Sequence, residues 1–448
     1  MPRRKKEELP QEEIRVIKTP PLVKGMRDVL PNDEKYWDFI DDQIRRIVSD
    51  YSFRRIATPV LEKFELFNHA LFKMGGQVER ELFYFIDRGE KLALRPEATA
   101  SVARAYVEHN LNNQILPLKL HYYGPMFRQT RGDTDRLRQF TMAGFEIIGD
   151  KNPALDAEMI IISYFLMQNL KLAVEVKLNS VGCQVCRPEY AKALLGHLRS
   201  RRTQICQDCK KRSVRDVLKF LSCKNPKCLK VREDAPQMMD WLCDDCRNHL
   251  FKVLEYLDEL KIPYQLDPSL LRTYDFYNRT VFEIYPANRP ADEEQFSLAG
   301  GGRYDTLIQM LGGNPTPATG FSVGIERLVN MMKLTRAELP PVIGPDVYVA
   351  QISELARQKT FSFFEALRAE KFSVRANLSK SSLKAQLDTA IKLGAKIVLI
   401  LGQKEVLEGT VIMRDMESGN QEVINLNRVV PEVKKKLKEK MMKELKMM

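Results

Sequence analysis

The eight cysteines of this chain are confined to one segment, between positions 183 and 246. They form four close pairs, three with two intervening residues and one with four. Short loops of this kind direct two thiolates at one tetrahedral ion, so four pairs can complete two four-cysteine zinc sites. Spacing does not determine which pairs share an ion. The predicted Zn²⁺ ligands are Cys183, Cys186, Cys206, Cys209, Cys223, Cys228, Cys243 and Cys246.

Paired cysteines can also form disulfides, but only where the compartment is oxidising. The N-terminal residues MPRRKKEELPQEEIR are charged and no apolar run follows them, and no later window offers eighteen uncharged apolar residues. We therefore expect neither a secretory signal nor a membrane span. The sequence predicts a cytoplasmic protein whose reduced cysteines bind metal.

The cysteine segment is also basic. The chain has a formal net charge of +12, and between Arg199 and Arg232 twelve lysines and arginines are opposed only by Asp208 and Asp216. A positively charged module held together by metal is suited to the backbone of a nucleic acid. A solvated basic surface without a partner is the alternative.

Strand-like segments precede and follow the cysteines, which indicates a module inserted into one sheet. Hairpin-length turns connect several strands, so the sheet of this α+β domain is expected to be antiparallel. Beyond the proline-rich ELPPVIGPDV, strands and helices alternate with short loops, which predicts a separate C-terminal α/β domain with parallel strands. The expected segments are a charged leader (1–20), the main domain (21–180 and 261–335), the cysteine-rich basic module (181–260), a linker (336–344) and the α/β domain (345–448).

The stretch FRQTRGDTDRLRQF, from Phe127 to Phe140, holds four arginines and no lysine. A guanidinium presents a planar fork of donors that suits phosphate or carboxylate. The apolar flanks predict two strands joined by a turn at 131–133. Three further segments could carry chemistry, namely LRPEATAS, SLAGGGRYDTL and PATGFSVGIERL. Each is a weak signal alone, since a triple glycine more often marks tight packing of strands.

Together and in this order, these segments resemble the class II aminoacyl-tRNA synthetases, and specifically the histidyl-tRNA synthetase family. The likeness extends from GMRDVLP, at Gly25 to Pro31, into the C-terminal domain. Its most specific parts are RTYDFYNRTVFEIY and AGGGRYD, which resemble the two histidine-binding motifs of that family. GFSVGIERL resembles motif 3, IATPVLEKFELF resembles the dimer-interface motif 1, and the arginine-rich hairpin resembles motif 2, which holds ATP.

The resemblance implies a homodimeric ligase that uses ATP and Mg²⁺ to adenylate histidine and transfers it to histidine tRNA. It implies that Arg128 contacts the α-phosphate, that Phe140 stacks on adenine, and that Arg327 binds the outer phosphates. Arg272 matches the catalytic arginine, near the α-phosphate and the amino-acid carboxylate. Fixed guanidinium groups there would stabilise the negative charge that grows during attack.

The resemblance also implies a pocket for the amino acid. Glu97 and Thr99 would hold the α-amino group, with Arg272 near the carboxylate. Glu146, Tyr277 and Tyr304 would surround the imidazole, whose two ring nitrogens a carboxylate and phenol hydroxyls can satisfy. The basic cysteine module would grip the acceptor arm of the tRNA, and the C-terminal domain would read the anticodon.

Several positions depart from the family pattern, and two of them bear most directly on ligand binding. Thr130 stands where motif 2 has glutamate, and Met142 stands where a glutamine helps to bind the amino group. An unsatisfied partner would weaken ground-state binding by about 1–3 kcal/mol. Two alternatives therefore stay open, a catalytically silent paralogue that binds histidine or tRNA, and a regulatory subunit of histidine biosynthesis. Such regulators resemble the synthetase without its anticodon-binding domain, which the C-terminal segment of this chain resembles.

Overall fold

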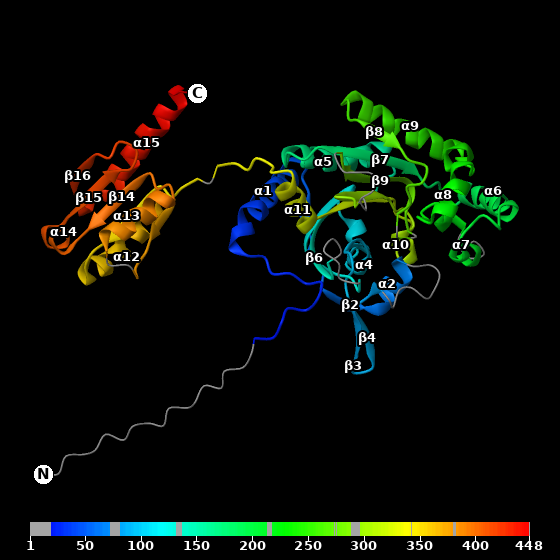
Figure 1. Ribbon diagram of the computed structural model, residues 1–448, viewed down its shortest axis with the longest axis horizontal. Coiled ribbons are helices and arrows are strands. Elements are labelled where there is room, and N and C mark those ends of the chain that lie inside the picture. Colours follow the sequence, from blue (N-terminus) through cyan, green and yellow to red (C-terminus); the bar gives the residue numbers. More distant parts are fainter. Residues whose placement is uncertain are drawn as a thin grey trace, which may run out of the picture. The chain divides into compact units, whose positions relative to one another are not determined.

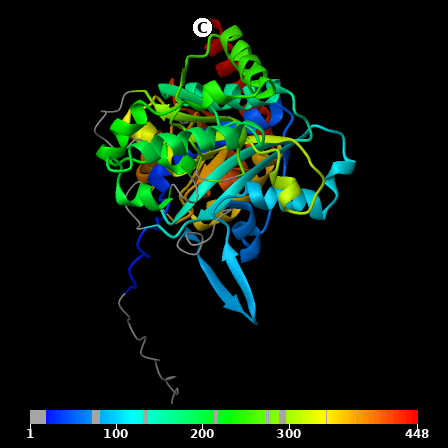
Figure 2. The same ribbon diagram turned by 90° about the vertical axis from the view of Figure 1, so that its right-hand side faces the viewer.

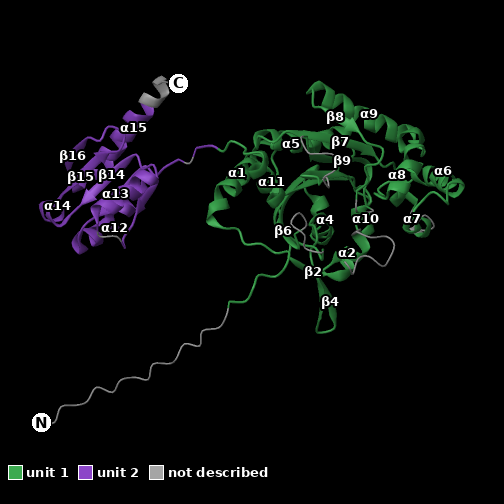
Figure 3. Ribbon diagram, viewed as in Figure 1, with its two compact units in different colours: residues 1–339 green, residues 340–448 purple. Residues whose placement is uncertain are grey.

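The computed structural model divides the chain into two compact units, Met1–Leu339 and Pro340–Met448 (Figure 3). The turn expected at 131–133, and nearly all of the expected leader, lie outside the described residues. The bounds expected within the first unit, 21–180, 181–260 and 261–335, remain a prediction. The described residues are 19–71, 81–130, 137–212, 217–272, 274, 276–287, 296–341, 343–379 and 382–447.

An eight-stranded sheet organises the first unit, in the order β1-β5-β6-β11-β10-β9-β7-β8 (Figure 1). Neighbouring strands run antiparallel except at the two edges, where β1 pairs with β5, and β8 with β7, in parallel. The expected antiparallel sheet is confirmed. Its strands are β1 (Arg54–Arg55), β5 (Leu118–Phe127), β6 (Gln139–Ile148), β7 (Val174–Ser180), β8 (Tyr264–Leu266), β9 (Asn278–Pro286), β10 (Ala299–Arg303) and β11 (Ala318–Gly324).

The pleat of β6 directs alternate residues to two separate hydrophobic clusters. Phe145 and Ile147 pack with residues of α1, α5, α9 and α11 on one face of the sheet. Met142 and Ile148 pack with residues of α2, α4 and α10 on the other face, and Glu146 lies between them in the alternation. The helices are α1 (Glu34–Asp50), α2 (Phe64–Leu71), α4 (Thr99–Glu108), α5 (Pro153–Asn169), α9 (Asp244–Glu259), α10 (Leu307–Met310) and α11 (Ile325–Leu334).

A hairpin projects from the first unit, as the two views of the ribbon agree (Figures 1 and 2). It consists of β3 (Tyr84–Asp87) and β4 (Glu90–Leu94), and β2 (Leu61–Lys63) pairs with β4 to complete a small sheet. Its two turn residues, Arg88 and Gly89, both have positive φ, which matches the twist of a tight hairpin.

The cysteine segment leaves and re-enters the same sheet, because β7 precedes it, β8 follows it, and these strands pair with each other. The fold class expected from the sequence, a main antiparallel α+β domain with an inserted cysteine-rich module, is confirmed. Between the two strands lie α6 (Cys186–Ser200), α7 (Gln207–Arg212), α8 (Pro226–Glu233) and α9. The 3-10 helices among the described residues are η1 (Pro31–Asp33), η2 (Leu111–Asn113), η3 (Val217–Phe220), η4 (Met238–Trp241) and η5 (Leu426–Arg428).

The second unit is an α/β domain with a five-stranded sheet in the order β13-β12-β14-β15-β16. Strands β13, β12 and β14 are parallel as expected, but β15 and β16 run antiparallel. The expectation of parallel strands was wrong there, since the connection 416–420 is too short for a crossover. The elements are β12 (Val347–Gln351), α12 (Glu354–Ala369), β13 (Val374–Ala376), α13 (Leu383–Lys392), β14 (Ile397–Leu401), α14 (Gln403–Glu408), β15 (Thr410–Asp415), β16 (Gln421–Asn425) and α15 (Val429–Met447).

A search of the described residues finds no helix with the length and apolar character that crossing a bilayer requires.

Candidate active site

A buried carboxylate lies at the centre of the eight-stranded sheet. Glu146, on β6, accepts hydrogen bonds from the Thr99 hydroxyl (2.8 Å) and from the Tyr304 hydroxyl (2.6 Å). Thr99 opens helix α4, whereas Tyr304 directly follows β10. Gly320 of the neighbouring strand β11 pairs with Glu146, and a Cβ at Gly320 would lie 1.7 Å from the carboxylate of Glu146. Only glycine at that position leaves room for this side chain.

Burial is the main influence on the ionisation of Glu146. Burial, together with the nearby charge of Glu97, raises the pKa of Glu146 to about 8, although the hydrogen bonds from Tyr304 and Thr99 act in the opposite direction. The site therefore holds a carboxyl group that can exchange its proton near neutral pH.

Glu97 caps the helix that carries Thr99. Its two carboxylate oxygens accept from the backbone N–H groups of Thr99 (2.7 Å) and Ala100 (2.9 Å). An anion is favourable at a helix N-terminus because free N–H groups and the helix dipole meet there. A carboxylate offers about four acceptor positions, so Glu97 retains capacity for a further donor such as an ammonium group. Arg95, in the same LRPEATAS segment, bonds to Thr58 and to the Pro125 carbonyl.

Arg272 and Tyr277 lie in the connection between β8 and β9. The Arg272 guanidinium forms an ion pair with Glu283 of β9, and its central carbon lies 5.3 Å from the centroid of the Tyr277 ring. A Cβ on Gly300, which pairs with Glu283, would lie 2.3 Å from the Arg272 guanidinium. One glycine of the triple-glycine motif therefore makes room for this arginine.

The other two glycines of that motif allow close approach of strands. A Cβ on Gly301 would lie 2.1 Å from the Gly320 carbonyl oxygen, and one on Gly302 would lie 2.4 Å from the Thr280 carbonyl oxygen. At Gly301 and Gly302 the motif therefore serves tight packing of strands, as the sequence analysis favoured.

The arginine-rich hairpin brings Arg128 and Phe140 together. The Arg128 guanidinium carbon lies 5.0 Å from the centroid of the Phe140 ring, and its Nε donates to the Pro96 carbonyl (3.0 Å). A cation over an aromatic face is a favourable pair, and both groups could contact a nucleotide, the cation at phosphate and the ring at the base. Arg327, in the first turn of α11, donates to the Ser297 carbonyl (2.8 Å).

Two functional candidates escaped the sequence analysis. Glu326 accepts the Thr141 N–H with both oxygens (2.8 and 2.9 Å) and so joins α11 to the strand that carries Phe140. Tyr122 donates to the Met142 sulfur (4.0 Å), where a thioether is only a weak acceptor. Its position on the inward face of β5 was the available signal, but periodicity alone does not separate a pocket from a core.

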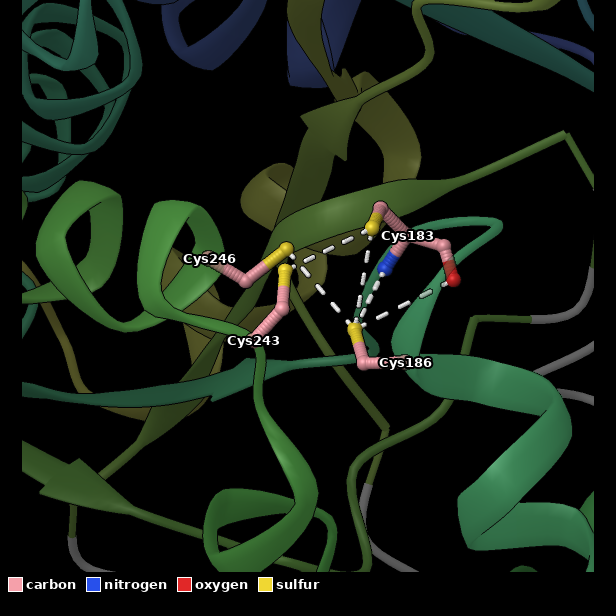
Figure 4. A group of neighbouring side chains, drawn as sticks. All are labelled: Cys183, Cys186, Cys243 and Cys246. Carbon is pink, nitrogen blue, oxygen red and sulfur yellow. Dashed lines mark hydrogen bonds between the residues drawn. The ribbon is translucent and has the colours of Figure 1, made fainter.

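The eight cysteines form two groups of four. The outer cluster, Cys183, Cys186, Cys243 and Cys246, combines the first and last pairs of the sequence, and Figure 4 shows it. The inner cluster combines the two middle pairs, Cys206, Cys209, Cys223 and Cys228.

Both clusters fit a tetrahedral metal ion. All eight cysteines are free thiols, and the sulfurs of each cluster lie within 4.8 Å of one another. In the outer cluster the Cys183 sulfur lies 3.7 Å from that of Cys186 and 3.8 Å from that of Cys243. Zinc with Zn–S bonds of about 2.3 Å separates its ligand sulfurs by about 3.8 Å. The donor chemistry and the spacing therefore both suit zinc.

The antiparallel sheet, the hairpin with its arginine and phenylalanine, the buried Glu146 with its hydroxyl partners and the separate α/β unit agree with the predicted resemblance to class II aminoacyl-tRNA synthetases. The family described as histidyl-tRNA synthetase matches residues 25–328, and the anticodon binding domain matches residues 346–436. The chain therefore belongs to the histidyl-tRNA synthetase family.

Relatives of known function cover nearly the whole chain. It is 38% identical to a histidine–tRNA ligase of Dehalococcoides mccartyi, over 92% of this chain and 99% of the relative. It is 40% identical to one of Syntrophotalea carbinolica, over 91% of this chain and 96% of the relative. Among solved structures, the apo histidyl-tRNA synthetase of S. aureus matches with a TM-score of 0.77 and 32% identity, over 94% of this chain and 100% of that one.

The raised pKa of Glu146 predicts a pH-dependent stability. In the unfolded chain this carboxyl ionises near its ordinary pKa of 4.5, whereas in the folded protein it holds its proton up to about pH 8. The folded state binds more protons in that window, so the free energy of unfolding falls as pH rises through it. Replacement Glu146→Gln removes this titration and is expected to flatten the decline, as measured by thermal unfolding between pH 5 and pH 9.

Glu175→Gln serves as the control, because Glu175 is exposed on β7. If the difference in unfolding temperature between the parent and Glu146→Gln stayed constant from pH 5 to pH 9, the prediction would be contradicted.

Proposed function

We propose that this protein is a histidine–tRNA ligase, which activates histidine with ATP and transfers it to the 3′ end of histidine tRNA. The observation that carries the proposal is the buried Glu146 carboxylate, bracketed by two hydroxyl groups on one face of the sheet. An imidazole presents one N–H donor and one acceptor, and a carboxylate beside phenol hydroxyls can satisfy both. The near full-length relatives named as histidine–tRNA ligases support the same assignment.

Selection of histidine rests on Glu146, Tyr277 and Tyr304, which we assign to the imidazole. A site built from buried polar groups rejects a ligand that leaves them unpaired. Glu97 and Thr99 are assigned to the α-amino group, since Glu97 keeps acceptor capacity beyond its two backbone bonds.

Activation requires the histidine carboxylate to attack the α-phosphorus of ATP, which enters as its Mg²⁺ complex, with pyrophosphate as the leaving group. Negative charge grows on the phosphoryl oxygens, and we assign its stabilisation to Arg272 and Arg128. The ion pair of Arg272 with Glu283 fixes its guanidinium before the reaction, so that little reorganisation is needed during it. Phe140 is assigned to the adenine and Arg327 to the outer phosphates.

A catalytically silent paralogue is the second candidate, and Met142 is the observation that favours it. The side chain is buried at 8% exposure and offers a thioether where the family places an amide. A regulatory subunit is disfavoured because residues 346–436 match the anticodon binding domain.

Pyrophosphate exchange separates an enzyme from a silent paralogue. We expect histidine, and none of the other amino acids, to support exchange of labelled pyrophosphate into ATP. Arg272→Ala is expected to lower the exchange rate by about two to three orders of magnitude, because a positioned donor to the transition-state charge is lost.

Arg45→Ala is a matched control, since Arg45 is exposed on α1 and pairs with Asp42 at 2.9 Å. Folded parent protein that shows no histidine-dependent exchange would favour the silent paralogue.

The tRNA is assigned to two basic surfaces. We assign the acceptor arm to the cysteine module (181–260), inserted between catalytic segments 21–180 and 261–335, and the anticodon to the C-terminal domain (345–448), which follows a linker (336–344). The concentration of lysines and arginines between positions 199 and 232 supports the first assignment, because cations that neutralise phosphates dominate binding to nucleic acids. Free thiols in all eight cysteines agree with a reducing, cytoplasmic compartment.

We assign one structural Zn²⁺ to each cysteine cluster. A double replacement of Cys206 and Cys209 by serine is expected to lower the zinc content from two ions to one per chain. The inner part of the module then unfolds, so tRNA binding weakens in a gel shift while histidine-dependent exchange largely persists. Parent protein that is purified without chelator and contains no zinc would contradict the assignment.

A homodimer is proposed from the projecting hairpin. Phe85 and Ile86 on β3 are 47% and 71% exposed, which is unusual for adjacent large apolar side chains and suits burial against a second copy. Ile86→Asp is expected to shift the mass measured by light scattering from dimer toward monomer. Ile391→Asp, at an isoleucine 62% exposed on α13, is the control. An unchanged dimer mass for Ile86→Asp would remove the hairpin from the interface.

A further inference from the structure

The outer cluster is built on the end of a sheet strand. After β7 ends, the Val181 N–H donates to the Arg279 carbonyl (2.8 Å), and the Arg279 N–H donates to the Gly182 carbonyl (2.9 Å). Gly182 has a φ of +67°, and a Cβ there would lie 2.8 Å from the Cys186 sulfur. The first cysteine pair therefore begins against the segment that carries Tyr277.

The loop of that pair fixes the backbone of the residue that follows it. The Cys183 N–H points at the Cys186 sulfur (3.1 Å), and the Val185 N–H points at the Cys183 sulfur (3.3 Å). The Arg187 N–H then donates to the Cys183 carbonyl (3.0 Å). Backbone N–H groups directed at sulfur are satisfied best when the sulfur is a metal-bound thiolate, so an ion would hold Arg187 in this position.

The Arg187 side chain reaches from this loop to the histidine pocket. Its Nε donates to the Val181 carbonyl (2.8 Å), and its Nη2 donates to the Tyr277 carbonyl (2.7 Å). One rigid guanidinium thus joins the end of β7 to the backbone of a residue whose ring lies beside Arg272.

The second cysteine pair also connects to the sheet. His249 lies in α9 one turn after Cys246, and its Nε2 bonds to the buried carboxylate of Asp156 (2.6 Å). Asp156 in turn pairs with the fully buried Arg303 (2.7 Å), the residue before Tyr304. Each pair of the outer cluster is therefore followed by a side chain, Arg187 or His249, whose hydrogen bonds lead to Tyr277 or to the residue before Tyr304.

The inner cluster is different. Apart from the backbone bonds within helices α7 and α8, the hydrogen bonds that the structure describes for its four cysteines join residues between positions 206 and 228. Its influence is expected to remain within the module.

We propose that Arg187 is a positioning residue for histidine binding, held by the metal-loaded outer cluster and acting through the Tyr277 backbone, whereas the inner cluster has no such part. The proposal rests on the proposed function, since Tyr277 must bind histidine. Under this proposal the outer cluster stabilises the fold of the module and also positions Tyr277 for histidine binding.

Arg187→Ala tests the proposal, and Arg247→Ala is its matched control. Arg247 follows the second cysteine pair as Arg187 follows the first, and its N–H donates to the Cys243 carbonyl (2.9 Å). Its guanidinium, however, contacts the Leu242 carbonyl (3.3 Å) and Asp244 (3.4 Å) within the module.

Arg187→Ala is expected to raise the Kd for histidine in calorimetry, and the KM for histidine in exchange, by roughly 10-fold or more, the effect of a lost charge-assisted hydrogen bond. The KM for ATP and the zinc content are expected to stay at parent values. The Kd for histidine of Arg187→Lys is expected to lie between those of the parent and Arg187→Ala, because an ammonium cannot donate to both carbonyls in the same fork geometry. Arg247→Ala is expected to bind histidine as the parent does.

The two clusters are compared with single replacements at half-buried cysteines. Cys243→Ser and Cys223→Ser are each expected to lower the zinc content, but only Cys243→Ser is expected to weaken histidine binding. Should Cys243→Ser fail to fold, Arg187→Ala still tests the proposal, because it alters no metal ligand.

The outcomes separate this inference from the proposed function. A parent protein that binds no histidine would overturn both. A parent that binds histidine, with weaker binding by Tyr277→Phe and unchanged binding by Arg187→Ala, would overturn the inference alone.

Discussion

A buried carboxylate in the middle of a sheet is the constraint on which the rest of the first unit depends. Glu146 needs hydrogen-bond partners, because a buried carboxyl group without them is costly whether or not it is ionised. Those donors come from the start of α4 and from the residue after β10, which are far from β6 in the chain. Gly320 opposite leaves the space. Helix α4, β10 and β11 must therefore meet at one point of the sheet for the carboxylate to be tolerated.

The inserted cysteine segment is also joined closely to this sheet. The outer cluster lies where the chain departs from β7 and returns through α9, so an ion there would close the base of the inserted module. The module's own apolar residues, such as Leu194 and Phe220, continue the main hydrophobic cluster of the sheet. Arg187 and His249 add polar links across the same boundary. Apolar packing and hydrogen bonds therefore both join the cysteine module to the sheet at this edge.

Much of the fold was predictable because its signals are local. The two strands that flank the arginine-rich stretch, β5 and β6, follow from their short-range apolar pattern. The antiparallel β15 and β16 were missed, since the preceding alternation of strands and helices suggested that the parallel pattern continues. The role of Glu326 was not predictable from the sequence, because a charged residue on a helix usually faces solvent and only the position of β6 against α11 supplies its N–H partner.

The sequence by itself determined that four cysteine pairs exist, because each short loop brings two thiols to one point without help from the rest of the chain. The residues predicted for the nucleotide and the imidazole came from the resemblance of its motifs to a known family, and their roles remain a prediction. The tertiary structure decided that the first pair joins the last and that the middle pairs join each other. That partition depends on where β7 and α9 lie in space, which arises from sheet pairing and hydrophobic burial over long sequence separations. The contact between Arg187 and the Tyr277 carbonyl follows from the same placement.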